Sequence, residues 1–299
     1  MRRWMLLLLV FVAPLAVFAA MVGVDRLFGA PGRGFDYVVG VTLPPAEGVV
    51  GLPPIEGPQD GSRPLVVIDA GHGGKDPGAG TGSVKEKDVT LALARALRAE
   101  LLNRGGFRVA LTRSDDRFLV LGERSTIARR LNADLFISIH ADSTGSNDQA
   151  SGASVYTLSD KGTSEVADKF AARENAADVV NGVDLGKQSG SVNSILVDLS
   201  QRESAARSQD FANLIRREGE GRIPFRERSE QSAAFAVLKA PDIPSVLFET
   251  GYISNEKDAA RLSSRQGQQA FAEVTARAIE VFFARMRNAD SQGVGGLQY

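Results

Sequence analysis

The stretch Leu65-Val-Val-Ile-Asp-Ala-Gly-His72 decides the fold class. Six mostly apolar residues followed directly by glycine are typical of a short strand that is buried on both faces of a sheet. Similar apolar runs recur along the chain. The sequence therefore predicts further strands at 107–112, 135–139, 152–158, 234–238 and 245–248.

Helical patterns separate these strands. Asp88 is a suitable N-cap for a helix with regularly spaced leucines, and Gly105 and Gly106 are suitable to end it. Further helical stretches are predicted at 122–132, 164–220 and 267–287. Strands that alternate with helices indicate an α/β fold, a single domain with a mixed, mostly parallel central sheet flanked by helices on both faces.

The N-terminus has the pattern of a secretory signal. Arg2 and Arg3 precede an apolar run, and the small residues Val17 and Ala19 favour cleavage after Ala19. The same run is nearly long enough to span a bilayer uncut, so residues 1–19 are predicted to be a signal peptide or a membrane anchor. The protein is therefore expected to be exported, with membrane contact only through this segment.

Composition divides the rest of the chain. Residues 20–62 are rich in glycine and proline and are predicted to form an extended linker. The predicted strands and helices place the folded domain at 63–288. The polar, glycine-rich residues 289–299 are predicted to be a disordered tail.

Charge and cysteine content exclude several classes of function. The formal net charge is −1, so no surface that binds nucleic acid is expected. The chain has no cysteine, which excludes disulfides, thiol catalysis and thiolate metal sites. Any metal ligand must therefore be a histidine or a carboxylate.

The chain contains only two histidines, His72 and His140, and each directly follows an apolar strand. Ligands bind at the carboxyl ends of the strands in open α/β sheets, so the two side chains are expected at one edge of the sheet. Neutral imidazole is a preferred ligand of zinc. The two histidines therefore predict a zinc site.

A catalytic zinc usually has three protein ligands and one open position. Without cysteine or a third histidine, the third ligand is predicted to be a carboxylate. Glu86 lies at the start of the first predicted helix, at the end of the loop that begins at His72, and is the preferred candidate. Asp76 is the competing ligand, and it ranks lower because Asp76-Pro77 is typical of a turn.

Glu249 is the candidate for proton transfer. It follows the apolar run 245–248, so its side chain is expected at the same edge of the sheet. A glutamate there can accept a proton from an attacking water and pass it to a departing amine. The alternative, which composition alone favours, is an exposed glutamate at the end of a strand.

Four blocks of sequence contain these candidates. They read Val67-Ile-Asp-Ala-Gly-His-Gly-Gly-Lys-Asp-Pro-Gly-Ala79, Lys85-Glu-Lys-Asp-Val89, Ser138-Ile-His-Ala-Asp142 and Pro244-Ser-Val-Leu-Phe-Glu-Thr-Gly-Tyr-Ile-Ser-Asn255. In content and order the blocks resemble the zinc-dependent N-acetylmuramoyl-L-alanine amidases of the type that separates daughter cells in Gram-negative bacteria. The resemblance runs from about residue 64 to residue 287.

The resemblance implies His72, Glu86 and His140 as ligands of Zn²⁺ and Glu249 as the catalytic carboxylate. It implies peptidoglycan as the substrate, cut between the lactyl group of N-acetylmuramic acid and L-alanine for wall remodelling and daughter-cell separation in the periplasm. Another zinc peptidase of the cell wall is an alternative, because the same residues would serve it. A non-catalytic wall-binding protein is a second alternative.

The charged stretch 159–230 is longer than a crossover needs, and it resembles the helical regulatory insert of the division amidases. In that family a helix of the insert covers the zinc until an activator protein with a LytM domain removes it. Position along the insert favours Glu165 as the autoinhibitory residue that fills the open zinc position. Helical phase instead favours Glu174, which shares a face with Val166 and Phe170. Glu165 is the preferred prediction and Glu174 the alternative.

Overall fold

The computed structural model describes residues 51–295, except 82–83, 144–149, 181–182, 185–193 and 241. These residues belong to one compact unit, Pro44–Tyr299. The predicted signal peptide or anchor at 1–19 and the predicted linker up to residue 50 lie outside the described residues. None of the helices in the described part combines the length and the apolar character that crossing a bilayer would require.

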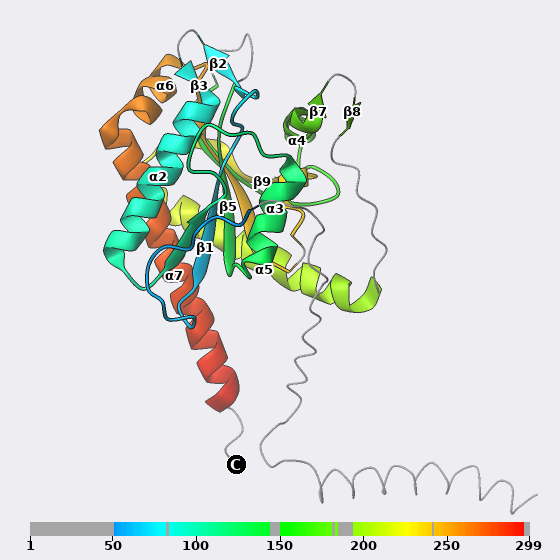
Figure 1. Cartoon of the computed structure of the whole chain (residues 1–299), viewed down its shortest axis with the longest axis vertical. Coiled ribbons are helices and arrows are strands. Elements are labelled where there is room, and N and C mark those ends of the chain that lie inside the picture. Colours follow the sequence, from blue (N-terminus) through cyan, green and yellow to red (C-terminus); the bar gives the residue numbers. More distant parts are fainter. Residues whose placement is uncertain are drawn as a thin grey trace, which may run out of the picture. The chain divides into compact units, whose positions relative to one another are not determined.

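A six-stranded mixed sheet lies at the centre of the described domain, in the order β4-β1-β5-β10-β6-β9 (Figure 1). Its strands are β1 (Leu65–Ala70), β4 (Arg108–Leu111), β5 (Leu135–Asp142), β6 (Ala153–Leu158), β9 (Phe225–Ala233) and β10 (Ser245–Tyr252). Neighbouring strands are parallel except β10 and β6. The predicted α/β fold with a mixed, mostly parallel sheet is confirmed.

Helices cover both faces of this sheet (Figure 1). One layer contains α2 (Glu86–Arg104), α5 (Ser194–Gly219), α6 (Glu256–Ser263) and α7 (Arg265–Gly295), and the other contains α3 (Leu121–Arg130), α4 (Glu165–Asn175) and the 3-10 helix η2 (Ala236–Leu238). The remaining short elements are β2 (Gly80–Thr81), β3 (Val84–Lys85), η1 (Ala176–Asp178), β7 (Val179–Val180) and β8 (Val183–Asp184).

Strand β1 shows why an unbroken apolar run predicts a central strand. It pairs with β4 on one side and β5 on the other, and all of its residues are buried. Val66 and Ile68 pack in the core formed with α2, α5 and α7, whereas Leu65 and Val67 pack in the core formed with α3 and α4. Successive residues of a strand point to opposite faces, so a strand covered on both faces needs apolar residues throughout.

Helix α2 begins earlier than predicted. It starts at Glu86, and Asp88 therefore lies in its first turn instead of capping it. Lys85 precedes the helix in an extended conformation, because it still pairs in the β2–β3 hairpin. Acidic side chains in the first turn suit the positive end of the helix dipole. The predicted end at Gly105 is confirmed.

The strand predicted at 234–238 is wrong. The chain forms η2 there, and the strand lies just before it as β9, which begins inside the stretch predicted to be an insert and runs three residues past its end. Among the described strands β9 lies at the edge of the sheet and pairs only with β6, and its sequence Phe225-Arg-Glu-Arg-Ser-Glu-Gln-Ser-Ala233 is largely polar. Charged residues on edge strands discourage pairing with other chains. A search for apolar runs therefore misses such a strand.

Helix α5 also lies inside the predicted insert at 159–230. Phe211 and Ile215 of this helix are nevertheless fully buried, in the same core as α2 and α7. The second half of the predicted insert is therefore part of the domain core. The first half, which includes α4, remains the candidate regulatory segment.

The folded domain is also longer than predicted at both ends. In the predicted linker, Glu56 and Val109 of β4 exchange two backbone hydrogen bonds. At the other end α7 continues to Gly295, past the boundary predicted at residue 288. Residues 296–299 lie outside the described residues.

Candidate metal centre

The four residues predicted to carry the chemistry lie at one edge of the sheet. His72 follows β1, His140 lies near the end of β5, and Glu249 lies in β10. Glu86 opens α2. His140 and Glu249 are direct neighbours in the register of the parallel strands β5 and β10. The carboxyl ends of the strands therefore bring together residues that are far apart in the sequence.

The loop after β1 directs His72 into the site. His72 Nδ1 lies 2.8 Å from Asp76 Oδ2, whereas Nε2 faces the carboxylates of Glu86 and Glu174. The other oxygen of Asp76 accepts the backbone N–H of Gly78 at 3.0 Å. A carboxylate that binds the far nitrogen of a histidine is a common outer partner in zinc sites. Asp76, the competing ligand in the sequence, therefore lies behind His72.

Two glycines allow the chain to approach these side chains closely. A Cβ atom on Gly71 would lie 2.6 Å from the imidazole of His140. Gly78 has a φ of 65°, and a Cβ atom there would lie 2.6 Å from His72 and 2.7 Å from Glu86 Oε2. Any larger residue at either position would push a candidate ligand out of place.

Glu86 lies between the two histidines. Its Oε2 is 3.1 Å from His72 Nε2, and its Oε1 is 3.1 Å from His140 Nδ1. The same two oxygens accept the backbone N–H groups of Ala79 at 2.8 Å and Ala141 at 2.9 Å. Hydrogen bonds from two separate segments thus fix the orientation of this carboxylate.

Helix α4 contributes a fourth donor. Glu174 Oε2 lies 3.4 Å from His72 Nε2 and 3.3 Å from His140 Nδ1, and its side chain is buried. Glu165, the residue that the sequence analysis preferred, is instead exposed at the first position of α4. The residue that reaches the site is the alternative, Glu174.

The packing of α4 explains which glutamate points inward. Its buried face comprises Ala167, Phe170, Ala171 and Glu174. Phe170 packs against Tyr156 and Phe235 with ring centroids 5.2 and 5.3 Å apart, and this contact sets the rotation of the helix. Val166, which the sequence had placed on the same face, is 58% exposed. Helical phase thus agrees with the structure for Phe170 and Glu174 but not for Val166.

The donor atoms of the two histidines and Glu174 have spacings that suit a tetrahedral metal site, and the two oxygens of Glu86 each lie close to one of the histidines. The nitrogen–oxygen distances from the two histidines to Glu86 are both 3.1 Å, and those to Glu174 are 3.3 and 3.4 Å. Tetrahedral zinc with bonds of about 2.0–2.1 Å requires ligand atoms about 3.3–3.4 Å apart. His72, His140 and Glu174 already form a group that can hold a metal ion, and Glu86 adds a second carboxylate. The residues present fit zinc.

The charges around the two imidazoles favour a cation. Burial opposes protonation of His72, but Glu86, Asp76 and Glu174 raise its pKa well above the usual value. Burial likewise opposes protonation of His140, but Glu174 and Glu86 raise its pKa to about 9. Carboxylates placed like this stabilise positive charge, carried by two protons or by one divalent ion. Metal uptake is therefore expected to release protons.

Glu249 lies beside the donors. Its Oε2 accepts the backbone N–H of Asp142 at 2.9 Å, and its Oε1 has no hydrogen-bond partner among the described residues. Burial, together with the carboxylates of Asp142, Glu86 and Glu174, raises the pKa of Glu249 well above its usual value. A carboxyl group with a raised pKa and one unpaired oxygen is suited to accept and return a proton.

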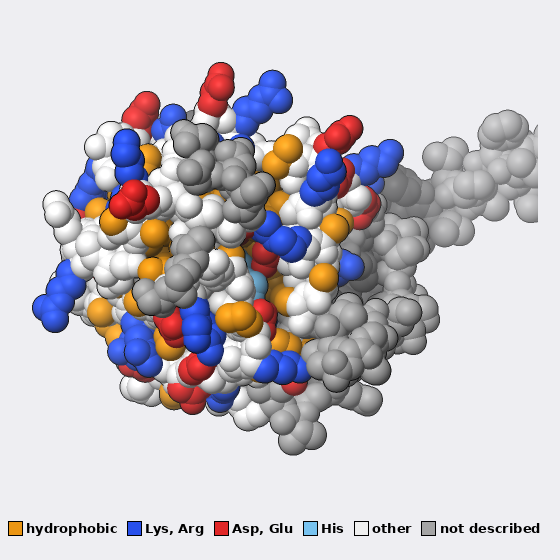
Figure 2. Space-filling model, turned by 90° about the horizontal axis from the view of Figure 1, so that it is seen from above, with side chains coloured by type: hydrophobic (Ala, Val, Ile, Leu, Met, Phe, Trp, Pro, Cys, Tyr) orange, Lys and Arg blue, Asp and Glu red, His pale blue; other side chains and the backbone are white. Residues whose placement is uncertain are grey.

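A second residue of α4 also contacts the site. Arg173 donates to the carbonyl oxygen of Ser143 at 2.7 Å and pairs with the carboxylate of Asp142. The pocket of about 420 Å³ around the donors is thus lined on one side by α4 and the residues that follow it. Figure 2 shows a histidine in this recess, between acidic and basic side chains.

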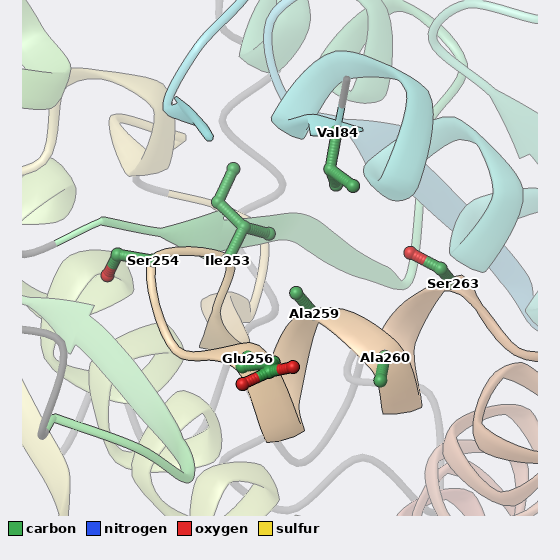
Figure 3. Close-up of a pocket in the computed structure, with 7 residues that line it drawn as sticks. All are labelled: Val84, Ile253, Ser254, Glu256, Ala259, Ala260 and Ser263. Atoms are coloured by element: carbon green, nitrogen blue, oxygen red, sulfur yellow. The ribbon is translucent and has the colours of Figure 1, made fainter. Parts of the chain in front are cut away.

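A separate hollow of about 430 Å³ lies between β3 and α6 (Figure 3). It is lined by Val84, Ile253, Ser254, Glu256, Ala259, Ala260 and Ser263. Its lining is mainly apolar and includes one carboxylate and no histidine, so it does not provide a set of metal donors. The chemistry is therefore assigned to the recess around His72 and His140.

Comparison with known proteins gives consistent matches. Residues 66–281 match the family model described as N-acetylmuramoyl-L-alanine amidase. The chain is 40% identical over 243 residues to the N-acetylmuramoyl-L-alanine amidase AmiC of Escherichia coli O6:H1, a match that covers 78% of this chain and 57% of that protein. It is also 40% identical over 225 residues to AmiA of Salmonella typhimurium, a match that covers 75% of this chain and 77% of that protein.

Solved structures match the same part of the chain. The N-acetylmuramoyl-L-alanine amidase AmiC2 of Nostoc punctiforme is 32% identical, with a TM-score of 0.53, and the match covers 74% of this chain and 97% of that one. The catalytic domain of CwlV from Bacillus (Paenibacillus) polymyxa is 29% identical, with a TM-score of 0.50, and the match covers 74% and 98%. Nearly the whole of each solved chain therefore corresponds to the described domain.

Proposed function

Because the chain belongs to the N-acetylmuramoyl-L-alanine amidase family, we propose that it hydrolyses the amide bond between the lactyl group of N-acetylmuramic acid and L-alanine in peptidoglycan. The observation that carries the proposal is the convergence of His72, Glu86, His140 and Glu249 at one edge of the sheet. This arrangement offers a zinc donor set next to a carboxylate with an unpaired oxygen. Zinc-assisted hydrolysis of an amide requires both.

In the proposed mechanism His72, Glu86 and His140 hold the zinc, and Glu249 moves the proton. When bound, zinc would act as a Lewis acid that polarises a carbonyl oxygen and lowers the pKa of a water molecule. Glu249 Oε1 accepts the proton of the attacking water and then donates it to the departing amine. The raised pKa of Glu249 helps it to keep the proton between these steps. The N–H of Asp142 holds Oε2 in place throughout.

Mass analysis of digested sacculi tests this function against its alternatives. The proposed amidase releases stem peptides that begin with L-alanine and leaves glycan strands without peptide. A zinc peptidase that cuts within the stem would leave L-alanine attached to the glycan, and a wall-binding protein would release nothing. Either result, obtained with zinc-loaded wild type and with the Glu174→Ala variant described below, would contradict the proposal.

We further propose that α4 represses the enzyme in cis. Glu174 fills the fourth donor position next to His72 and His140, and Arg173 ties the helix to Asp142. Both contacts keep water and substrate away from that side of the site. The proposal also rests on the resemblance of the first part of 159–230 to the regulatory insert of division amidases. An activator with a LytM domain is the proposed partner that displaces α4, and the periplasm is the proposed compartment.

Replacing Glu174 with alanine is expected to raise the turnover of sacculi without any activator. The substitution removes the oxygen that occupies the fourth donor position and weakens the hold of α4. If the closed state is preferred by about 1.4–2.8 kcal/mol, the rate should rise by about ten- to a hundredfold. Dye release from labelled sacculi measures this rate.

Glu165→Ala is the matched control, because it makes the same substitution on the same helix at an exposed position. Its rate should equal that of wild type. Activation by Glu165→Ala alone would overturn the assignment to Glu174. Zinc content is measured in parallel, because loss of both zinc and activity in Glu174→Ala would make Glu174 a permanent ligand instead of an inhibitor.

A further inference from the structure

Two arginines bind the loop that carries His72 from inside the protein. Arg113 and Arg124 are among the largest fully buried side chains of the described residues, with 0% and 2% of their surface exposed. Most of their hydrogen bonds go to backbone carbonyl oxygens, and several of these belong to residues 70–72. Burying a guanidinium group is costly unless its donors are satisfied, so such an arrangement needs an explanation.

Arg113 joins the loop to the start of α2. Its Nε donates to the carbonyl oxygen of Ala70 at 2.9 Å. Its Nη2 donates to the carbonyl oxygens of Gly71 and Lys87, both at 2.8 Å. Lys87 directly follows Glu86. One guanidinium group therefore fixes the loop that carries His72 relative to the first turn of α2, which carries Glu86.

Arg124 of α3 holds the same loop from a second direction. Its Nη1 donates to the carbonyl oxygen of Ala70 at 2.7 Å and to Asp69 Oδ1 at 2.9 Å, and its Nη2 donates to the carbonyl oxygen of His72 at 2.9 Å. Thr90 Oγ1 adds a bond to the carbonyl oxygen of Gly71 at 2.8 Å. Three consecutive carbonyl groups are thus fixed by donors from three segments.

The backbone of this loop needs such support. His72 has a φ of 59°, in the left-handed region, and among the described residues Asn132 is the only other non-glycine residue with positive φ. A side chain disfavours this conformation, which persists where the surrounding structure enforces it and often occurs at functional sites. The carbonyl groups on both sides of the His72 Cα atom are the ones that the arginines and Thr90 hold.

We propose that Arg113 and Arg124 are positioning residues that lock residues 70–72 in the left-handed turn and thereby direct His72 Nε2 at Glu86 and His140. They would hold His72 in its binding orientation in the metal-free protein and thereby raise the affinity for zinc. This inference rests on the zinc site of the proposed function. Arginine suits the task because its planar fork reaches several carbonyl oxygens in fixed directions, whereas the ammonium group of lysine is a single point of charge.

Arg113→Lys and Arg124→Lys test the inference in the full chain. Each variant keeps the positive charge but reaches fewer of the loop carbonyls. The zinc dissociation constant, measured by competition with a chromogenic chelator, is expected to rise by about ten- to a hundredfold, as for other outer partners of zinc ligands. Excess zinc should restore most of the turnover, because the donor and proton-transfer groups are all present. Thr90→Val, a milder change, should raise the dissociation constant less.

Ile279→Val is the control for a general loss of stability, because Ile279 is fully buried in α7 and packs in the core. It should lower the free energy of unfolding without changing zinc affinity. The positioning role would be overturned if Thr90→Val and the folded arginine variants all bound zinc as tightly as wild type. It would also be overturned if Ile279→Val lost as much zinc affinity as they do. A wild-type protein that binds no zinc would instead refute the proposed function.

Discussion

Replacing Glu249 with glutamine is expected to lower the turnover of sacculi by about two to four orders of magnitude, the usual contribution of general acid–base catalysis. Glutamine has the same shape, and its carbonyl oxygen can still accept the N–H of Asp142. Its amide group cannot accept the proton of water. Zinc content should be unchanged, because Glu249 is separate from the four donor side chains. Dye release in a Glu174→Ala background measures the loss without interference from repression.

Stability measurements distinguish a chemical effect of Glu249→Gln from unfolding. The pKa of Glu249 is raised in the folded, metal-free protein above its ordinary value of 4.5. At pH values above this ordinary value, the unfolded chain carries the charge freely, whereas the folded chain must bury the charge or bind a proton. The carboxyl group therefore lowers stability at neutral pH. Glutamine removes this effect, so the urea midpoint of the metal-free variant should equal or exceed that of wild type.

Glu256→Gln is the matched control for this experiment, because Glu256 is an exposed glutamate at the start of α6. Its turnover should stay at the wild-type level. A Glu249→Gln variant that retains near wild-type turnover would show that another group transfers the proton. If Glu249→Gln lost both activity and stability, unfolding would explain the lost activity, and the expected urea midpoint would be contradicted.

Replacing His72 or His140 with alanine should remove zinc binding and activity together. Each substitution deletes one of the two imidazole donors and leaves one imidazole with the carboxylates of the site. The loss of zinc affinity should exceed the roughly ten- to hundredfold effect of removing an outer partner. Zinc content after dialysis, and turnover before and after zinc addition, measure it. Chelators should likewise inactivate the wild type, and zinc should restore it. Full turnover by metal-free protein would refute the mechanism.

Asp76→Asn separates a ligand from an outer partner. Asparagine keeps an acceptor oxygen close to His72 Nδ1 but loses the negative charge. The variant should therefore bind zinc more weakly than wild type, yet more tightly than His72→Ala does. A loss as complete as that of His72→Ala would make Asp76 a direct ligand, which is the alternative that the sequence left open.

The sequence by itself determined the class of fold and the place of the chemistry. Central strands such as β1 and β5 must be apolar on both faces, so they stand out as unbroken runs that end where the sheet ends. His72, His140 and Glu249 each follow or end such a run. Parallel strands end at a common edge, so their proximity could be inferred without knowledge of any long-range contact.

Only the tertiary structure decided which glutamate of α4 reaches the site and what holds the His72 loop. Glu165 and Glu174 lie on different faces of one amphipathic helix, and contacts of Phe170 with Tyr156 and Phe235 rotate that helix so that Glu174 points inward. The polar edge strand β9 and the buried Arg113 and Arg124 carry no local signal of burial either. Their positions depend on partners far away in the sequence, and a periodic pattern of apolar residues records only that a face is covered, without identifying what covers it.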